Sequence, residues 1–368
     1  MVVDDRNFLV DPWRGRSYKV DPVTPTRLPL LSNSSLNTFR RCPREYFFRY
    51  VLLRKARAKT AALRFGTLFH VALNAWWLCS GDALAKLFAA LVAIASQIGE
   101  RDPFEMAKAR ALIVGYTARW GWEGYETIAV ELQFRLPIMT CDEMRDGGDR
   151  VVARSAPYPI GYDLGGAIDV IIKHRGRVRN VEHKTTSADI SIGSDYWRHV
   201  VTMDPQVSTY HHAAHRLGYA PHDTLYDVVR KPALVPLLAT PEEDRKYTKP
   251  TKKEPTPRLY ANQREQDETS EEYEARLLAE IESNPAKYFA RMPIVRLERD
   301  NAEHERDVRE TAELIAYAEQ GNIWPRSPNA CERFGRLCEY HDTCSGLAVI
   351  EDNTRYETKK RQHEELDV

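Results

Sequence analysis

The feature that most constrains the fold is the stretch GAIDVIIKHRGRVRNVEHKTT, which runs from Gly166 to Thr186. Two runs rich in β-branched residues flank HRGR, which is a turn signal, so the stretch predicts a β-hairpin. A two-residue loop and a four-residue loop both place Lys173 opposite Val178. The register of the two strands is therefore defined before the turn type is known.

In this register Asp169 faces Glu182 across the two strands, and Lys184 lies two residues beyond Glu182 on the same face. Opposed carboxylates repel each other unless a cation lies between them. Mg²⁺ and Mn²⁺ take carboxylate oxygens and water as ligands, and a neighbouring lysine can stabilise developing negative charge. The three side chains predict a metal site on a sheet, although a solvated hairpin face would carry the same residue types.

Basic and acidic residues balance, with 53 Lys+Arg and 53 Asp+Glu among 368 residues. The zero net charge excludes a global attraction to nucleic acid, so any nucleic-acid surface must be a local patch. No apolar run reaches 18 residues and the N-terminus lacks a signal-peptide pattern, which predicts a cytoplasmic protein without a membrane anchor. In that compartment the six cysteines are expected to be thiols or metal ligands rather than disulfides.

The periodicity of apolar residues changes along the chain, from a helical pattern to a strand pattern and back. Strands that lie between helices predict an α/β fold with a central mixed sheet flanked by helices. The expected segments are an N-terminal arm (1–31), a helical region (32–125), a strand-rich core (126–235), a basic Pro-rich loop (236–268), a second helical region (269–325), a cysteine-rich segment (326–350) and a tail (351–368).

The Pro-rich loop contains DRKYTKPTKKEPTPR, with six Lys or Arg against two acidic residues. Its prolines argue against regular structure. A solvated flexible loop is the expected structure, and a DNA-contacting loop is the alternative. The last segment of the chain, RYETKKRQHEELDV, is expected to be a frayed tail.

Further short motifs follow the order found in a known family. GTLFH ends at His70, VELQF contains Glu131, and QVSTY places Gln206 and Tyr210 four residues apart on one helix face. Together with GAID and EHK, these motifs resemble the RecB-like branch of the PD-(D/E)xK nuclease superfamily. The resemblance spans residues 32–345.

The resemblance implies a restriction-endonuclease-like core at 126–235 and metal-dependent hydrolysis of phosphodiester bonds. The implied ligands of Mg²⁺ or Mn²⁺ are His70, Asp169, Glu182 and the backbone carbonyl of His183. Lys184 would orient the attacking water or stabilise the transition state, and Glu131 would support the water network or a second metal. Gln206 and Tyr210 would hold the DNA backbone and align the lysine. Taken alone, His70 also fits a core histidine, and Glu131 also fits a surface glutamate.

The cysteines extend the resemblance to iron–sulfur nucleases of the AddB and CRISPR-adaptation type. The segment SSLNTFRRCPREYFFRYV resembles the first part of those proteins. In that type one early cysteine joins three late ones around a [4Fe–4S] cluster. The corresponding residues here are Cys42, Cys331, Cys338 and Cys344. Their late spacing, C-x6-C-x5-C, is wider in its first gap than the C-x2-C-x5-C of that type. A zinc site that includes His341, or free thiols, are the alternatives.

The resulting hypothesis is a DNA exonuclease of recombination, repair or phage replication. The chain lacks a G-x-x-x-x-G-K-[ST] loop and so has no motor of that kind. It is expected to act alone, as a homo-oligomer, or beside a helicase or a strand-annealing protein. A non-catalytic DNA-binding subunit and a redox-sensing iron–sulfur protein are the alternative hypotheses.

Overall fold

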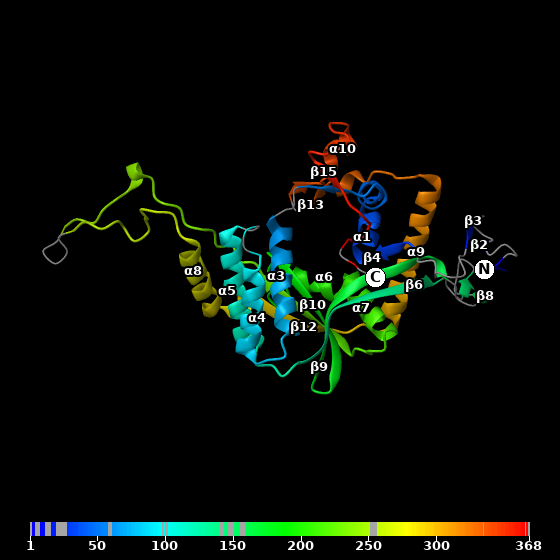
Figure 1. The fold of residues 1–368 in the computed structure, drawn as a ribbon, viewed down its shortest axis with the longest axis horizontal. Coiled ribbons are helices and arrows are strands. Elements are labelled where there is room, and N and C mark those ends of the chain that lie inside the picture. The colour runs from blue at the N-terminus through cyan, green and yellow to red at the C-terminus, as the bar shows by residue number, and fades with distance from the viewer. Residues whose placement is uncertain are drawn as a thin grey trace.

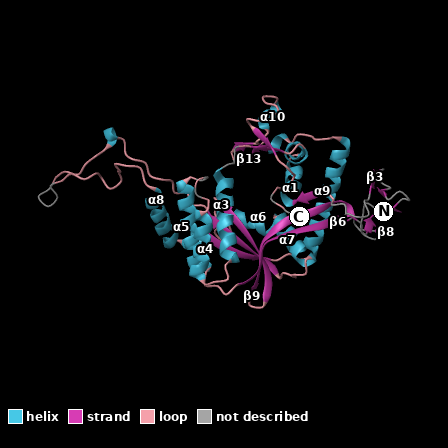
Figure 2. Cartoon of the chain, viewed as in Figure 1, coloured by secondary structure: helices cyan, strands magenta, loops and turns pink. Residues whose placement is uncertain are grey.

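In this computed structural model, a six-stranded mixed sheet lies at the centre and helices cover both of its faces (Figures 1 and 2). The structure describes residues 2–3, 8–11, 16–19, 28–57, 61–97, 99, 102–139, 143–145, 151–154, 159–250, 256–333, 335–364 and 366. The strands of the central sheet are β4 (Leu30–Ser32), β6 (Glu126–Met139), β9 (Pro159–His174), β10 (Arg177–Thr186), β11 (Asp223–Arg230) and β12 (Phe289–Ile294). The mixed sheet flanked by helices confirms the predicted fold class.

The long strand β9 organises the sheet. β6 pairs with β9 in antiparallel orientation, and β10, β11 and β12 follow in that order on the far side of β9. The β10–β11 and β4–β9 pairs are parallel, and the other pairs of this sheet are antiparallel. Asp169 therefore lies on a strand that has a neighbouring strand on each side, β6 and β10.

The predicted hairpin forms between β9 and β10 in the expected register. Lys173 pairs with Val178, as the sequence pattern requires. The turn residues Arg175 and Gly176 have φ values of 49° and 78°. Positive φ at both central residues is the signature of a two-residue type I′ turn, whose twist matches that of the strands it joins. Of the two loop lengths that the sequence allows, the shorter one is formed.

Helices pack on the sheet as two groups, each with its own hydrophobic core. Figure 1 shows α3, α4, α5 and α8 on one side of the sheet and α1, α7 and α9 on the other. The first group is α3 (Ala61–Leu78), α4 (Ala83–Ala95), α5 (Pro103–Trp120) and α8 (Ser270–Ser283). The second group is α1 (Asn33–Arg41), α7 (Pro205–Arg216) and α9 (Glu298–Gly321).

Local sequence signals explain where the helix beside the site begins. Asp204 is the N-cap of α7, because its carboxylate accepts a hydrogen bond from the Gln206 N–H (2.9 Å). Pro205 occupies the first helical position, where its missing N–H costs nothing. Asp and Pro at these two positions are sequence signals for the start of a helix, and they fix the side chains of α7 relative to the sheet.

The remaining elements are short, and several of them join distant parts of the chain. They are β1 (Val2–Val3), β2 (Phe8–Asp11), β3 (Arg16–Lys19), α2 (Pro43–Tyr46), the π-helical turn η1 (Phe47–Val51), β5 (Arg54–Ala56), β7 (Glu143–Arg145), β8 (Val151–Arg154), α6 (Asp195–Met203), η2 (Glu242–Asp244), η3 (Pro285–Lys287), η4 (Pro328–Ala330), β13 (Glu332–Arg333), β14 (Arg336–Leu337), α10 (His341–Ser345) and β15 (Tyr356–Thr358). The predicted N-terminal arm lies largely outside the described residues. No helix among the described residues is both long enough and apolar enough to cross a membrane.

Two segment boundaries predicted from the sequence are wrong. The sheet takes β12 from the region 269–325, which was predicted to be helical, and β4 from the N-terminal end of the chain. β12 is a six-residue segment, FARMPI, between two strongly charged helices, and its period-two signal is too short to separate from theirs. The core therefore draws strands from outside 126–235.

The C-terminal segment is not a frayed tail. β15 pairs with β5 in antiparallel orientation. Tyr356, His363 and Leu366 are buried. The prediction failed because the segment has few apolar residues, and its contacts are with residues about 300 positions earlier in the chain. Tyr356 packs in one cluster with Phe48, and Gln362 Nε2 donates to the Tyr50 carbonyl (2.9 Å).

Residues 236–250 and 256–268, in the predicted basic Pro-rich loop, are arranged in a way that the sequence did not predict. Two extended segments run beside each other and are joined by backbone hydrogen bonds, including Thr248 N–H to Arg258 O (2.8 Å) and Tyr260 N–H to Lys246 O (3.0 Å). Figure 1 shows them projecting away from the sheet beyond α8. Proline removes only its own N–H, so the residues between prolines can still pair across the two segments.

Candidate metal-binding active site

Three side chains from three separate elements converge beside the sheet. His70 comes from α3, Glu131 from β6 and Asp169 from β9, and one ligand atom of each lies within 4.8 Å of the others. No other three His, Cys, Asp or Glu side chains in the described parts of the chain lie this close together. Imidazole nitrogen and carboxylate oxygen are donors that suit Mn²⁺ and Mg²⁺, so these residues fit a divalent cation.

The backbone of Glu131 is strained. Its φ is 50°, a left-handed conformation that is uncommon for a residue with a Cβ. The strand changes phase at this residue, because Val130 packs in the core of the first helix group and Leu132 in that of the second. Residues two apart on a regular strand share a face, so Glu131 marks a break in that alternation. Such strain is typical of functional sites, where it aims a side chain.

A neighbouring amide orients the Glu131 carboxylate. Asn74 Nδ2 donates a hydrogen bond to Glu131 Oε1 (2.8 Å). Asn74 lies one helical turn after His70 on α3, so both side chains leave the same face of the helix. Sequence analysis did not identify Asn74, although its i,i+4 spacing from His70 was the available signal.

Protonation in the metal-free site follows from burial. Burial lowers the pKa of His70, so its imidazole is neutral and can act as a ligand. Partial burial also raises the pKa of Glu131, against the effect of the Asn74 hydrogen bond. The ring of His70 lies edge-on to the ring of His183, whose backbone carbonyl is the predicted further ligand.

Glu182 lies next to this group but outside it. Its side chain is buried, and its Oε2 atom has no hydrogen-bond partner in the described structure. Burial, and then the charge of Asp169, raise its pKa to about 8. A buried carboxylate oxygen without a partner is costly, and a cation is the usual partner for one. The predicted ligand set included Glu182 and left Glu131 in a supporting role, whereas the compact group contains Glu131.

A chain of hydrogen bonds links the predicted lysine to α7. Lys184 Nζ contacts Glu182 Oε1 and donates to Gln206 Oε1 (2.8 Å), and Gln206 Nε2 donates to the Tyr210 hydroxyl (3.0 Å). Burial alone would lower the pKa of Lys184, but the charges of Glu182 and Asp169 raise it above its ordinary value. The amine is therefore a fixed positive charge beside the carboxylates.

His183 points to the opposite face of β10, into a buried polar row that sequence analysis did not identify. The row consists of directly paired residues on three neighbouring strands: His183 on β10, Asp227 on β11 and Arg291 on β12. His183 Nδ1 lies 3.1 Å from Asp227 Oδ2, and Arg291 Nε lies 3.1 Å from Asp227 Oδ1. These are ion-pair distances at which the angles depart from those of a hydrogen bond.

Aromatic residues enclose this row. Tyr116 of α5 donates its hydroxyl to Asp227 Oδ2 (2.6 Å) and accepts from Arg291 Nη2 (2.7 Å). The Arg291 guanidinium lies over the rings of Trp120 (4.3 Å) and Trp77 (5.8 Å). Burial would raise the pKa of Asp227, but Arg291 and His183 hold it below its ordinary value. Asp227 and Arg291 are therefore held in their charged forms behind the site.

The site is thus tied to the row through His183, both by its backbone and by its ring, which lies edge-on to the His70 ring with 6.3 Å between the centroids. The His183 N–H donates to Asp169 Oδ2 (2.8 Å), while the His183 side chain contacts Asp227 on the other face. Because the side chain is buried and paired, the backbone groups of His183 have a fixed orientation. They lie between the two acidic residues of the hairpin.

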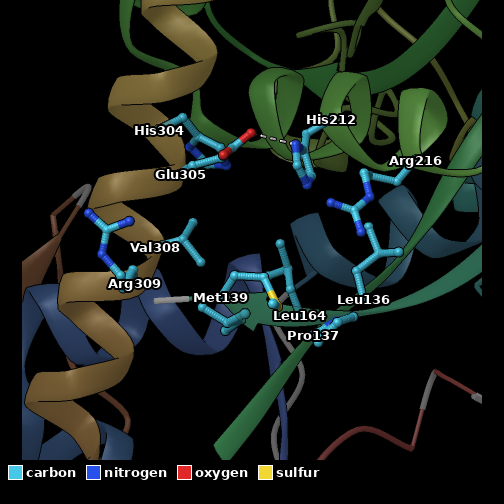
Figure 3. Close-up of a pocket in the computed structure, with 11 residues that line it drawn as sticks. Leu136, Pro137, Met139, Leu164, His212, Arg216, His304, Glu305, Val308 and Arg309 are labelled. Atoms are coloured by element: carbon cyan, nitrogen blue, oxygen red, sulfur yellow. Dashed lines mark ion pairs between the residues drawn. The ribbon is translucent and has the colours of Figure 1, made fainter. Parts of the chain in front are cut away.

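The His-rich stretch of α7 does not form a metal site. Figure 3 shows His212 paired with Glu305 of α9 on one side of a cavity. Leu136 and Leu164 line the cavity on the other side. His212 Nδ1 lies 2.7 Å from Glu305 Oε1, an ion pair between two helices.

The four predicted cysteines surround a second cavity, close to the chain ends. It is lined by Cys42, which precedes α2, and by Cys331, Cys338 and Cys344, together with His341. Burial raises the pKa of Cys338 to about 12 and also raises that of Cys344. The segments that carry these cysteines meet directly, because Arg44 Nε donates to the Trp324 carbonyl (2.7 Å).

Comparison with known proteins supports one assignment. Residues 30–345 match the family described as PD-(D/E)XK nuclease superfamily, and this range contains every residue of the site. No curated protein matches the chain. The chain is similar to the solved structure described as "Crystal structure of SSO0001", with 12% identity and a TM-score of 0.24 over 70% of this chain and 79% of that one. The family match covers most of the chain, which therefore belongs to the PD-(D/E)XK nuclease superfamily, a group of divalent-metal nucleases.

Proposed function

We propose that this protein is a metal-dependent deoxyribonuclease that acts as an exonuclease. The observation that carries the proposal is the convergence of His70, Glu131 and Asp169 beside Glu182 and Lys184. Superfamily membership over most of the chain supports it. The arrangement supplies metal ligands and a fixed cation, which are the two things that phosphodiester hydrolysis needs from a protein.

A bound Mg²⁺ or Mn²⁺ would supply an activated water and would neutralise charge on the scissile phosphate. His70, Glu131 and Asp169 would hold the ion. The unpaired Oε2 of Glu182 and the backbone carbonyl of His183 would be further ligands. The neutral state of His70 suits this role, because a protonated imidazole has no free lone pair.

Lys184 would stabilise the negative charge that develops on the phosphate. Its side chain is 30% exposed, whereas that of Glu182 is 2% exposed, so the amine can reach a substrate while the carboxylate stays behind it. Gln206 fixes the amine, and Tyr210 in turn fixes Gln206. The fixed charge would act without reorganisation during the reaction.

A cleavage assay tests this proposal. Purified protein is incubated with end-labelled single- and double-stranded DNA in Mn²⁺, Mg²⁺ or EDTA. We expect degradation in a divalent metal that is lost in EDTA and in the Asp169→Ala and Lys184→Ala variants. Binding without cleavage in every metal would instead support a non-catalytic DNA-binding subunit.

As an exonuclease, the protein would serve recombination, repair or phage replication. It would act as a homo-oligomer or beside a helicase or a strand-annealing protein. A circular single strand distinguishes the two modes of cleavage, because it offers no end. We expect linear DNA to be degraded and circular DNA of the same sequence to persist. Degradation of the circle at a similar rate would show endonucleolytic cleavage.

We also infer that the chain belongs to the RecB-like iron–sulfur branch, with a [4Fe–4S] cluster on Cys42, Cys331, Cys338 and Cys344. All four line one cavity. A tetrahedral zinc site would need sulfur atoms about 3.8 Å apart, given Zn–S bonds of about 2.3 Å. Among the described residues, no three ligand atoms around this cavity lie within 4.8 Å of one another, which favours a larger cluster. Burial raises the pKa of the Cys338 and Cys344 thiols, so the positive charge of bound metal ions would be needed to form their thiolates.

The cluster proposal has its own test. Protein purified without oxygen should be brown and contain iron, and Cys331→Ser should lose both the colour and the iron. Stoichiometric zinc in colourless protein would overturn the iron assignment. Because β5 and β15 already join the two ends of the chain, we expect the variant to lose stability without unfolding completely.

A further inference from the structure

A basic arm leaves the sheet beside the strand that carries Glu182 and Lys184. Directly after β11, the Lys231 N–H donates to the Thr186 carbonyl at the end of β10 (2.7 Å). The chain that follows contains the basic arm, defined as residues 234–250 and 256–268. The arm therefore begins close to the end of β10. This strand ends at Thr186, two residues beyond Lys184.

The base of the arm is attached to α8. Tyr273 donates its hydroxyl to the Leu234 carbonyl (2.7 Å). The Leu237 N–H donates to Glu268 Oε2 (2.8 Å), and Arg276 Nε donates to Glu268 Oε1 (2.7 Å). Glu268 is buried, so this ion pair is shielded from water and fixes the direction in which the arm projects.

The arm has order along its length. The Thr240 N–H donates to the Arg264 carbonyl (2.8 Å), and the Thr248 N–H donates to the Arg258 carbonyl (2.8 Å). After the helical turn η2, an extended segment from Arg245 to Pro250 spans up to about 17 Å, at about 3.3 Å per residue. This length is close to half a turn of duplex DNA, whose full turn is about 34 Å. Figure 1 shows that the outer part of the arm touches no other element.

Charge is concentrated on the outer part of the arm. Residues 245–264 contain seven Lys or Arg and one acidic residue, in a chain whose total charge is balanced. The amines of Lys246 and Lys249 make no hydrogen bond or ion pair within the described structure. Tyr247 and Tyr260 are each 47% exposed among these charges. Interleaved basic and aromatic side chains suit a nucleic acid, because they bind phosphate and stack on bases.

The basic character continues to the root of the arm. Lys231 and Lys108 of α5 lie near each other, and burial followed by the charge of Lys108 lowers the pKa of Lys231. By contrast, Glu242, Glu243 and Asp244 form an acidic turn just before the basic run, so phosphate is repelled there.

We propose that the basic arm binds the phosphate backbone of the nucleic acid held at the metal site, through Lys246, Lys249 and Arg258. The contact would extend the bound length by about five nucleotides or base pairs, at about 3.4 Å each along one strand. The identity of the polymer rests on the proposed function. The arm would grip a long substrate and leave a short one unaffected.

The test removes two charges from the arm and compares two lengths of DNA. Lys246→Gln/Lys249→Gln is made in the Lys184→Ala background so that DNA is not degraded, and affinity is measured over a range of salt concentrations. For 30-residue DNA, the slope of log affinity against log salt should flatten by about 1.8 for a duplex and about 1.4 for a single strand. For a six-nucleotide strand, the slope should not change.

The matched control is Arg299→Gln/Arg306→Gln, which removes two exposed charges from α9. We expect this control to bind DNA as the background protein does. An unchanged slope in the arm variant would overturn the proposal. If sedimentation then also showed a changed oligomeric state, the arm would be a contact between copies of the protein. Cleavage of the six-nucleotide strand by Lys246→Gln/Lys249→Gln with Lys184 intact tests the nuclease separately, so the two proposals can fail independently.

Discussion

The two faces of β10 carry charges in opposite states. On one face, which we call the site face, Glu182 keeps an unpartnered buried oxygen, and Lys184 stays partly exposed. On the other, which we call the network face, His183, Asp227 and Arg291 form a row at ion-pair distances with at most 4% of any side chain exposed. One strand thus carries an acidic cluster that can take up a cation and, on its other face, a row in which the Asp227 carboxylate already lies between two basic side chains.

The difference shows how the fold supports a reactive site. Unpaired buried groups destabilise a protein, and a rigid surrounding is needed to hold them in place. The network face provides that rigidity through ion pairs and neighbouring aromatic rings, and it reaches the site through the backbone and the ring of His183. We therefore expect changes on the network face to affect stability first, and changes on the site face to affect activity first.

The largest effect is expected from Arg291→Met. This change leaves Asp227 buried without its cation, which should reduce the free energy of unfolding by about 3–5 kcal/mol. Urea denaturation measures the loss. The exposed Arg299, substituted in the same way, is the control and should change stability by less than about 0.5 kcal/mol.

The double variant Arg291→Met/Asp227→Asn sharpens this test, because it removes both charges. It should recover part of the stability lost in Arg291→Met. If the single and double variants were equally destabilised, packing rather than charge would hold the network face together.

The next effect concerns the site face. Asp169→Asn removes a metal ligand charge but keeps an oxygen that can accept from the His183 N–H. We expect a loss of activity of about 100- to 1,000-fold, or about 3–4 kcal/mol in the barrier. Unfolding in EDTA should show unchanged or higher stability, since one of two neighbouring carboxylates is gone. A variant that lost activity and stability together would contradict the division between the faces.

A smaller effect is expected from pH. The pKa of Glu182 is about 8 in the folded, metal-free protein, above its ordinary value of 4.5. Between these values the folded state binds more protons than the unfolded state, so metal-free stability should fall as pH rises, by up to about 1.4 kcal/mol per pH unit. Below about 4.5 this contribution is fully present, and above about 8 it is lost.

Denaturation in EDTA at several pH values measures this slope, and Glu182→Gln is the control that should remove it. In the presence of a divalent metal the trend should reverse, because the ion must displace the Glu182 proton and therefore binds more tightly as pH rises. Identical slopes in the wild type and Glu182→Gln would show that another group controls the pH response.

The smallest effect is expected from Tyr116→Phe on the network face. The change removes one hydroxyl that bonds both Asp227 and Arg291, while their mutual ion pair remains. We expect a loss of about 1–2 kcal/mol in stability and little change in activity. A large loss of activity at unchanged stability would mean that the network reaches the site more directly than through His183.

Much of the candidate site was predictable because its signals are local. The register of the hairpin follows from β-branched runs around a turn, and the position of Asp169 opposite Glu182 follows from the register. Gln206 and Tyr210 share a face because they are four residues apart on a helix whose cap, Asp204, is also visible in the sequence. Each of these inferences needs only a short stretch of chain.

Other features could not be predicted because they depend on distant contacts. The left-handed backbone of Glu131 has no signature in its residue type, and it is this conformation that places Glu131 with His70 and Asp169. The row behind the site joins residues from three strands separated by more than 40 residues in sequence. β12 and the packed C-terminal segment were missed for the same reason.

The sequence by itself determined the hairpin, the order of the site residues and the alternation of helices and strands, because spacing within one element sets which side chains share a face. Only the tertiary structure decided which of these residues lie within reach of one cation, which charges are buried and paired, and that the basic segment projects as an ordered arm. Those properties depend on contacts between segments far apart in the chain, and no local pattern encodes them.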